Sequence, residues 1–226
     1  MAATDLTIPE SLLLLALNEE TGERKGTFLP YALAGAALTE LLLQGRLAEA
    51  GHPAKKLEIV DSTPTGDAFL DSCLERVAEK GSGKDARAYI ESLGARANLL
   101  HPLYDRLTDR GILSEQKSKM LFVLTRTTHP EADHAPEQAL KDRLAKAIAG
   151  DGHVEERDSV IIALALHTDI LKYNFDKDEL RKNKSRIKKI ADGNLLPPNA
   201  AIKTIHAMQA AVMIAAIVPA IVVSTN

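Results

Sequence analysis

The chain has 226 residues, which is enough for one large domain or two small ones. Its 28 Lys and Arg against 31 Asp and Glu give a net charge of −3, which excludes a protein basic enough overall to coat DNA or RNA but leaves room for a local basic patch. Apolar residues make up 45% and aromatic residues only 4%, with no Trp, so Leu, Ala and Ile must fill the core, which favours helices over a β-sandwich.

Targeting signals and disulfides are not expected in this chain. The N-terminal residues lack the basic segment of a signal peptide, and the apolar run Ser11–Leu17 is short. The single Cys73 cannot form an intramolecular disulfide and indicates a reducing compartment. We therefore expect a cytoplasmic protein.

The first half of the chain predicts helices and one short strand. Thr7–Glu10 has the pattern of a capping box and opens a short helix that runs through Leu17. A longer helix is expected from about Pro30 to Gln44. Leu57–Val60 predicts a strand, and Asp61–Asp67, which is rich in turn formers, predicts a loop. The next helices are expected over about Ala68–Glu79, Ala86–Leu93 and Leu99–Arg110.

The second half adds one extended segment between helices. Lys117–Thr128 contains β-branched and aromatic residues without a helical stripe, which predicts a hairpin or an extended arm. The apolar run Ala207–Val223 is 17 residues long and contains Pro219, so we interpret it as part of a helix buried on all sides rather than a membrane span. Helices are expected over about Pro136–Ala149, Glu155–Lys172, Lys177–Ala191 and Pro198–Val223.

These elements predict a mainly α fold in a single domain over residues 1–226. We find no repeat of fixed period and no long linker, so one domain is the simplest organisation. The expected architecture is a compact helical domain around a buried C-terminal helix, with a small protruding β-hairpin.

Residue types that often serve in active sites occur in several segments, but each has a simpler interpretation. Gly81–Asp85 lacks the upstream Gly and the following Ser or Thr of a phosphate-binding loop, so we interpret it as a surface loop. His129–His134 contains His, Glu and Asp but lies between elements, so we favour a polar loop and predict no bound metal. His167 lies in an apolar helix, and Cys73 has no clear activating partner. We predict no catalytic residue and no cofactor.

The segment Arg181–Lys189 is the strongest charge feature of the chain. Its six cations are uninterrupted by acids and would surround a narrow stripe of Ile187 and Ile190 on a helix. Such a surface attracts anionic lipid by roughly 1 kcal/mol per cation and would equally attract nucleic acid. The simpler interpretation is a solvated outer face. The cations are Arg181, Lys182, Lys184, Arg186, Lys188 and Lys189.

The expected hairpin carries a run of apolar residues. Strand alternation would bury only half of them, so the others must meet another subunit, a membrane surface or a neighbouring element. A strand buried on both faces is the simpler interpretation. We predict that this run serves membrane contact or self-association; it consists of Met120, Leu121, Phe122, Val123 and Leu124.

Two motifs are specific in combination: Pro64–Asp67 (PTGD) followed by Leu-Asp, and the helix Gly35–Leu47 with the pattern GA-x-L-x-E-L-x-L-x-G-R-L. With five further segments in the same order, over nearly the whole chain, the sequence resembles the Golgi phosphoprotein 3 family. The segments are IPESLLLLALNEETG, YALAGAALTELLLQGRL, DSTPTGDAFLD, LTDRGIL, TTHP, IIALALHTDIL and AIKTIHAMQAAV.

The resemblance implies a compact helical domain with a protruding β-hairpin and no catalysis. The best-understood eukaryotic members are cytosolic peripheral membrane proteins. They bind phosphatidylinositol 4-phosphate and act as coat adaptors that retain glycosyltransferases in the Golgi. The hairpin of the family is implicated in self-association and membrane contact, which implies a homo-oligomer here.

The family's headgroup-binding residues are not retained in this chain. By a gapless alignment, Lys25 stands in place of a Trp, and Ala34, Ala97 and Leu100 stand in place of arginines. A phosphate monoester needs charge-assisted donors. The cations nearby in sequence, which we predict as substitutes, are Arg24, Lys25 and Arg96.

The sequence therefore predicts a non-enzymatic peripheral membrane or adaptor protein, with an anionic lipid or phosphoinositide headgroup and a protein tail as partners. The alternative is a homo-oligomeric protein-interaction scaffold without lipid binding. A small-molecule enzyme would instead require an open pocket lined by His167, Asp169 and Cys73.

Overall fold

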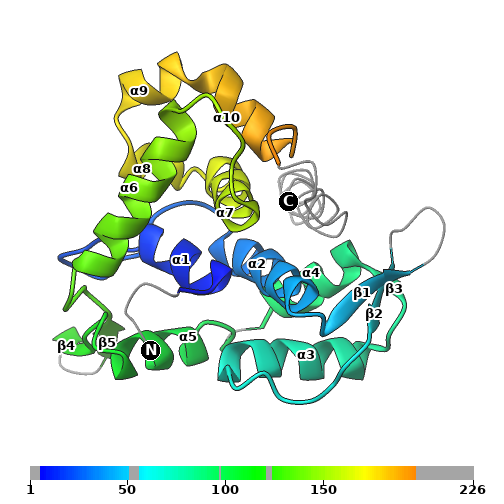
Figure 1. Ribbon diagram of the computed structural model, residues 1–226. Helices are drawn as coiled ribbons and strands as arrows, with labels where there is room; N and C mark the ends of the chain where they lie inside the picture. The colour runs from blue at the N-terminus through cyan, green and yellow to red at the C-terminus, as the bar shows by residue number, and fades with distance from the viewer. Residues whose placement is uncertain (1–5, 51–55, 97, 121–123, 197–226) are drawn as a thin grey trace, which may run out of the picture.

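The computed structural model describes residues 6–50, 56–96, 98–120 and 124–196. The fold is mainly helical, as predicted, and its described residues form two small antiparallel sheets (Figure 1). The helices are α1 (Ile8–Leu15), α2 (Leu29–Leu43), α3 (Ala68–Lys80), α4 (Ala86–Gly94), α5 (His101–Asp109), α6 (Ala135–Ala149), α7 (Glu156–His167), α8 (Leu171–Asn174), α9 (Lys177–Lys182) and α10 (Lys184–Ala191).

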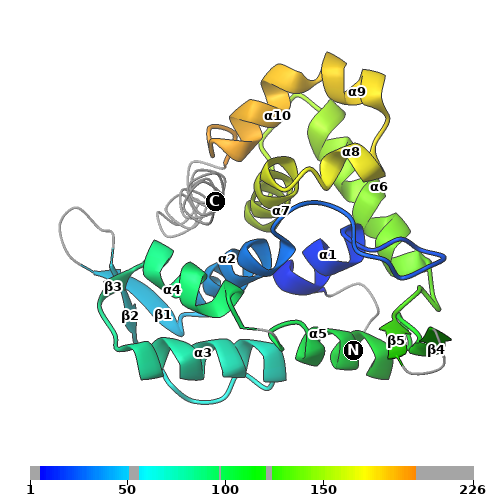
Figure 2. The same ribbon diagram turned by 180° about the vertical axis from the view of Figure 1, so that it is seen from behind.

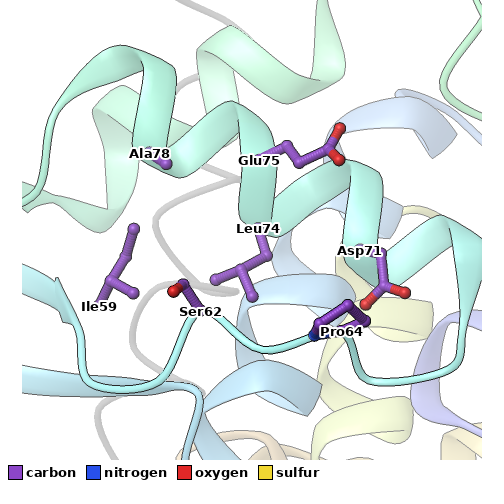
Figure 3. Close-up of a pocket in the computed structure, with 7 residues that line it drawn as sticks. All are labelled: Ile59, Ser62, Pro64, Asp71, Leu74, Glu75 and Ala78. Carbon is purple, nitrogen blue, oxygen red and sulfur yellow. The ribbon is translucent and has the colours of Figure 1, made fainter.

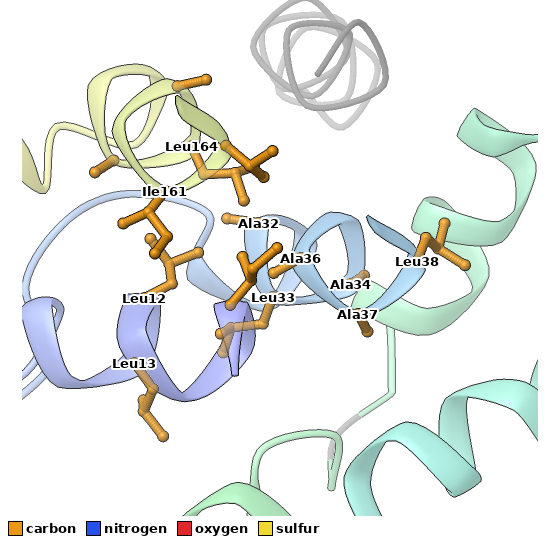
Figure 4. Packing of buried hydrophobic residues seen from close by; sticks show 14 of the residues in the cluster. Leu12, Leu13, Ala32, Leu33, Ala34, Ala36, Ala37, Leu38, Ile161 and Leu164 are labelled. Atoms are coloured by element: carbon orange, nitrogen blue, oxygen red, sulfur yellow. The ribbon is translucent and has the colours of Figure 1, made fainter. Parts of the chain in front are cut away.

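The centre of the core is formed by α1 and α2, because nearly all of their residues are apolar and buried. The predicted capping box opens α1: the Thr7 hydroxyl accepts from the Glu10 backbone N–H, and the Glu10 carboxylate accepts from the Thr7 backbone N–H. Leu12 of α1, Leu33 of α2 and Ile161 of α7 meet in the core (Figure 4). The C-terminal run 198–223, predicted as a buried helix, lies outside the described residues.

Buried carboxylates attach α5 to this core. Glu10 Oε1 accepts hydrogen bonds from Arg106 Nε and Arg110 Nη1, both at 2.8 Å. Asp67 caps the N-terminus of α3 through Oδ1, while its Oδ2 lies 3.4 Å from Arg106 Nη1. Three of the sequence motifs therefore have structural roles, since Glu10, Asp67 and Arg110 belong to IPES, PTGD and LTDRG.

A three-stranded antiparallel sheet lies at one end of the molecule and has the order β1 (Leu47–Ala50), β2 (Lys56–Ile59) and β3 (Lys84–Asp85). The sequence predicted only β2. Gly81–Asp85, predicted as a surface loop, does lie at the surface, since Ser82, Lys84 and Asp85 are exposed, but its last two residues form β3. The Tyr89 hydroxyl donates to the Gly81 carbonyl at 2.7 Å.

Two of the predicted helices are interrupted. The helix expected over Glu155–Lys172 ends at His167, because Asp169 adopts a left-handed conformation (φ 64°), and α8 follows. The helix expected over Lys177–Ala191 is divided at Asn183 into α9 and α10. The first interruption has a structural role. Because the helix ends there, the Thr168 carbonyl is available to accept a hydrogen bond from the Thr27 N–H, at 2.9 Å.

The predicted hairpin is confirmed. It consists of β4 (Gln116–Met120) and β5 (Leu124–Thr128), paired from Gln116↔Thr128 to Met120↔Leu124. An isolated bridge between Leu113 and Glu131 continues the pairing below its base. In the described part of the chain, no helix combines the length and apolar character that crossing a bilayer requires.

Candidate functional site

The predicted basic segment forms an outward-facing surface on α9 and α10. Ile187 and Ile190 are buried, where α10 packs on α7, as the apolar stripe predicted. The cations around that stripe point to solvent, except Arg186. We call the exposed set the basic surface: Arg181, Lys182, Lys184, Lys188 and Lys189.

Arg186 serves the fold instead. Its Nε donates to the Ala147 carbonyl and its Nη2 to the Gly152 carbonyl, both at 2.9 Å. It thereby ties α10 to the last turn of α6 and to the loop that follows it. Arg181 also has a partner, Asp178, in an exposed pair at 3.1 Å. The lysines make no ion pair within the described ranges, so they carry most of the available positive charge.

Arg24 and Lys25 lie on the loop between α1 and α2, which we call the α1–α2 loop. Arg24 bridges back to Leu17, and the Lys25 backbone N–H donates to the Ala16 carbonyl at 2.6 Å. Burial raises the pKa of Tyr104, and the nearby positive charge of Arg24 partly offsets that rise. The two predicted donors therefore share one loop, in which Arg24 acts on Tyr104 of α5 and Lys25 acts on Glu131.

Arg96 belongs to a different element, since it is exposed just after α4. Of the other positions that the family resemblance assigned to the headgroup, Ala34 and Leu100 are buried, and residue 97 lies outside the described ranges.

The α1–α2 loop packs against the base of the hairpin. Gly22 has φ +64°, and a Cβ placed there would lie 2.4 Å from the His129 carbonyl carbon. Across the same interface, Arg126 Nη2 donates to Glu23 Oε1 at 2.6 Å, and the His129 ring stacks on Tyr104 with centroids 4.1 Å apart. The loop and the hairpin base therefore form one unit.

Of the predicted apolar run, only part is described. The backbones of Met120 and Leu124 pair with each other at the end of the hairpin. Leu121, Phe122 and Val123 lie outside the described residues. Figures 1 and 2 place the hairpin and the α9–α10 pair at opposite ends of α6.

Two of the residues considered for an enzyme, Cys73 and His167, lie on different helices. Burial raises the pKa of the Cys73 thiol to about 12, which keeps it protonated and unreactive at neutral pH. Cys73 lies on α3 and His167 on α7. An apolar pocket of about 140 Å³ lies elsewhere, between α3 and the loop before it (Figure 3); it is lined by Ile59, Ser62, Pro64, Asp71, Leu74, Glu75 and Ala78.

Comparison with known proteins agrees with this architecture. The family model for Golgi phosphoprotein 3 (GPP34) matches residues 8–208. A VPS74-like protein of Dictyostelium discoideum is 23% identical over 159 residues, which cover 64% of this chain and 61% of the relative. The vacuolar protein sorting-associated protein 74 of Eremothecium gossypii is 30% identical over 165 residues, which cover 63% of this chain and 49% of the relative.

The matches thus span about half to three fifths of the length of these relatives. The family match is broader in this chain, since it runs from the start of α1 to beyond α10. It includes the hairpin, the α1–α2 loop and the basic surface. The chain belongs to the Golgi phosphoprotein 3 family.

Proposed function

We propose that this chain is a non-enzymatic peripheral membrane adaptor that binds anionic membrane surfaces. The observation that carries the proposal is the basic surface, in which lysines without ion-pair partners in the described structure project from α9 and α10. Each cation near an anionic bilayer contributes about 1 kcal/mol. Four lysines therefore suffice for reversible attachment even though the chain is acidic overall.

The hairpin supplies the second part of the proposal. In this proposal the apolar run that the sequence predicts contacts either the bilayer interior or a second copy of the chain, because apolar side chains exposed to water are unfavourable. In this arrangement Arg24 and Lys25, next to the hairpin base, contact the phosphates of lipid headgroups. Arg96 lies on another element and adds only longer-range attraction.

The test is co-sedimentation of the full chain with vesicles of three compositions: neutral lipid, neutral lipid with phosphatidylserine, and neutral lipid with phosphatidylinositol 4-phosphate. Each is run at about 0.05 M and about 0.5 M salt, since high salt shortens the Debye length to a few ångström. We expect binding to both anionic vesicles, reduced at high salt, and no binding to neutral vesicles.

Preference for the phosphoinositide at equal surface charge would add a specific headgroup site, and Arg24→Gln with Lys25→Gln should then remove the preference. Binding that does not change with salt concentration would contradict the proposed electrostatic attraction between the basic surface and anionic lipid. An absence of binding to every vesicle would contradict the membrane role and favour the interaction scaffold.

A further inference from the structure

A group of acidic side chains joins the α1–α2 loop to the start of α6. Glu131 is buried, and its Oε2 lies 2.7 Å from His134 Nδ1. Glu19, on the α1–α2 loop, places its Oε2 3.9 Å from the same nitrogen. The ligand-type atoms of these three residues all lie within 4.8 Å of one another.

In the described ranges, one lysine forms ion pairs with this group of acids. A third acid, Glu137, is also buried beside it, and Lys141 Nζ lies 2.9 Å from Glu137 Oε2 and 2.6 Å from Glu19 Oε1. Among the described residues, Lys141 is the only Lys or Arg with an ion pair to these acids; His134 adds a second positive charge only when protonated, and Lys25 acts on Glu131 through space. Three carboxyl groups therefore depend on one lysine and one imidazole, and a carboxylate without a partner is costly in a buried position.

Two oxygens in the group also lack hydrogen-bond partners. Glu131 Oε1 and Glu137 Oε1 are both buried, and no donor in the described structure reaches them. The Glu131 side chain is fully buried, so bulk water does not satisfy it. The carboxyl groups of Glu131 and Glu137 also contact each other, so two acids share one buried position. A cation bound beside Glu131 would give its carboxylate a partner of opposite charge.

We propose that Glu19, Glu131 and His134 bind a divalent transition-metal ion of the Zn²⁺ class. One imidazole nitrogen with two carboxylate oxygens suits Zn²⁺, whereas Mg²⁺ and Ca²⁺ prefer oxygen alone. Ligand atoms at 2.0–2.1 Å from a tetrahedral ion lie about 3.3 Å apart. The two distances to His134 Nδ1 are 2.7 and 3.9 Å, and all of the ligand atoms lie within 4.8 Å of one another, so side-chain movements of about 1–2 Å would seat the ion.

Access to the proposed site is open. The His134 side chain is 62% exposed and that of Glu19 is 45% exposed, so an ion can enter from solvent and reach the buried Glu131. The bound ion would fasten the α1–α2 loop, which carries Arg24 and Lys25, to the segment that follows the hairpin. The inference does not depend on lipid binding, because its ligands and its test are separate from the basic surface.

The test uses the full chain purified without a polyhistidine tag and stripped with EDTA. Isothermal titration with Zn²⁺ at pH 7.5 should show one ion per chain, and Mg²⁺ should show none. We expect His134→Ala and Glu19→Gln each to weaken Zn²⁺ binding at least about tenfold. The matched controls His153→Ala and Glu20→Gln alter an exposed His and an exposed Glu outside the site and should bind as the unaltered chain does.

Circular dichroism of each variant separates loss of the site from loss of the fold, and both ligand substitutions are at exposed side chains. The Co²⁺ absorption spectrum gives an independent readout, since ligation by His134 changes its visible bands. The inference is overturned if the unaltered chain binds no Zn²⁺, if His134→Ala binds it equally well, or if Glu19→Gln has no effect.

Discussion

At the scale of single residues, buried charges determine how the helices are held together. Glu40 of α2 is 1% exposed, and its two oxygens accept from Arg157 Nη1 and Nη2 at 2.6 and 2.7 Å. Its Oε2 also accepts from the Ile8 backbone N–H at 3.1 Å. One carboxylate thus joins the N-terminus of α1, the body of α2 and the start of α7.

Removing the arginine of this pair should destabilise the protein strongly. Arg157→Ala leaves the Glu40 carboxylate buried without its bidentate partner, which costs about 2–3 kcal/mol after allowing for the half-exposed guanidinium. Urea unfolding measures the loss. Arg87→Ala, which breaks an exposed pair with Glu91, should cost under about 1 kcal/mol. Equal losses in the two variants would contradict the structural role of Glu40.

The pH dependence of stability should contain a contribution from His167. Burial lowers the pKa of His167 below its ordinary value of 6.5, so the unfolded chain binds the proton more tightly than the folded one. This contribution is fully present above pH 6.5 and is lost as the pH falls through the folded pKa. His167→Asn should flatten the stability profile between about pH 7 and pH 5, measured by urea midpoints. An unchanged profile would show that His167 is solvated.

At the scale of elements, the sequence predicts helices and the hairpin well but short strands poorly. The capping box of α1 and the β-branched run of the hairpin are local signals, and both are confirmed. The strand Leu47–Ala50 has the sequence LAEA, which has no β preference, so only its pairing with β2 makes it a strand. Likewise, Asp169 ends α7 at a point where the apolar pattern continues.

In the candidate site, too, the sequence predicted features that depend on neighbouring residues but not those that depend on contacts between distant segments. Charge spacing alone predicted which cations surround Ile187 and Ile190. It did not predict that Arg186 donates to carbonyls of α6 and of the loop after it, since those partners are backbone atoms. Nor did spacing link Glu19 to Glu131, because the two residues are far apart in the sequence and only the fold brings them together.

The contact between the α1–α2 loop and the hairpin base should depend on Gly22. Gly22→Ala would place a Cβ 2.4 Å from the backbone carbonyl carbon of His129. It would also put a side chain on a residue in the left-handed conformation, at φ +64°. Gly45→Ala is the matched control, because Gly45 has φ +71° but no atom within 4 Å of its Cβ position. The control should cost about 1–2 kcal/mol, and Gly22→Ala clearly more. Equal unfolding free energies would mean that the loop is not held against the hairpin.

At the scale of the whole molecule, the proposed membrane contacts are two separate regions. The hairpin and the basic surface lie at opposite ends of α6 (Figure 1). This helix has 15 residues and is therefore about 22 Å long. That length exceeds the Debye length of about 8 Å at physiological salt. The two regions should therefore contribute independently and respond differently to salt.

Shortening the hairpin should separate self-association from lipid attachment. Replacing residues 120–124 by Asn-Gly keeps a tight turn and removes the apolar run. If that run builds an oligomer, light scattering should show a smaller assembly, while the basic surface still binds anionic vesicles in a salt-sensitive way. If the mass of the assembly and the binding to vesicles are both unchanged, the apolar run serves neither self-association nor membrane contact.

The measurement that tests the account most directly compares two charge reversals of equal size in vesicle co-sedimentation. One variant changes Lys182, Lys188 and Lys189 of the basic surface to Glu. The other changes Lys56, Lys80 and Lys84, which are exposed near the three-stranded sheet, to Glu. The account predicts that only the first variant loses most of its binding to phosphatidylserine vesicles at low salt. Equal losses, or full binding by the first variant, would contradict it.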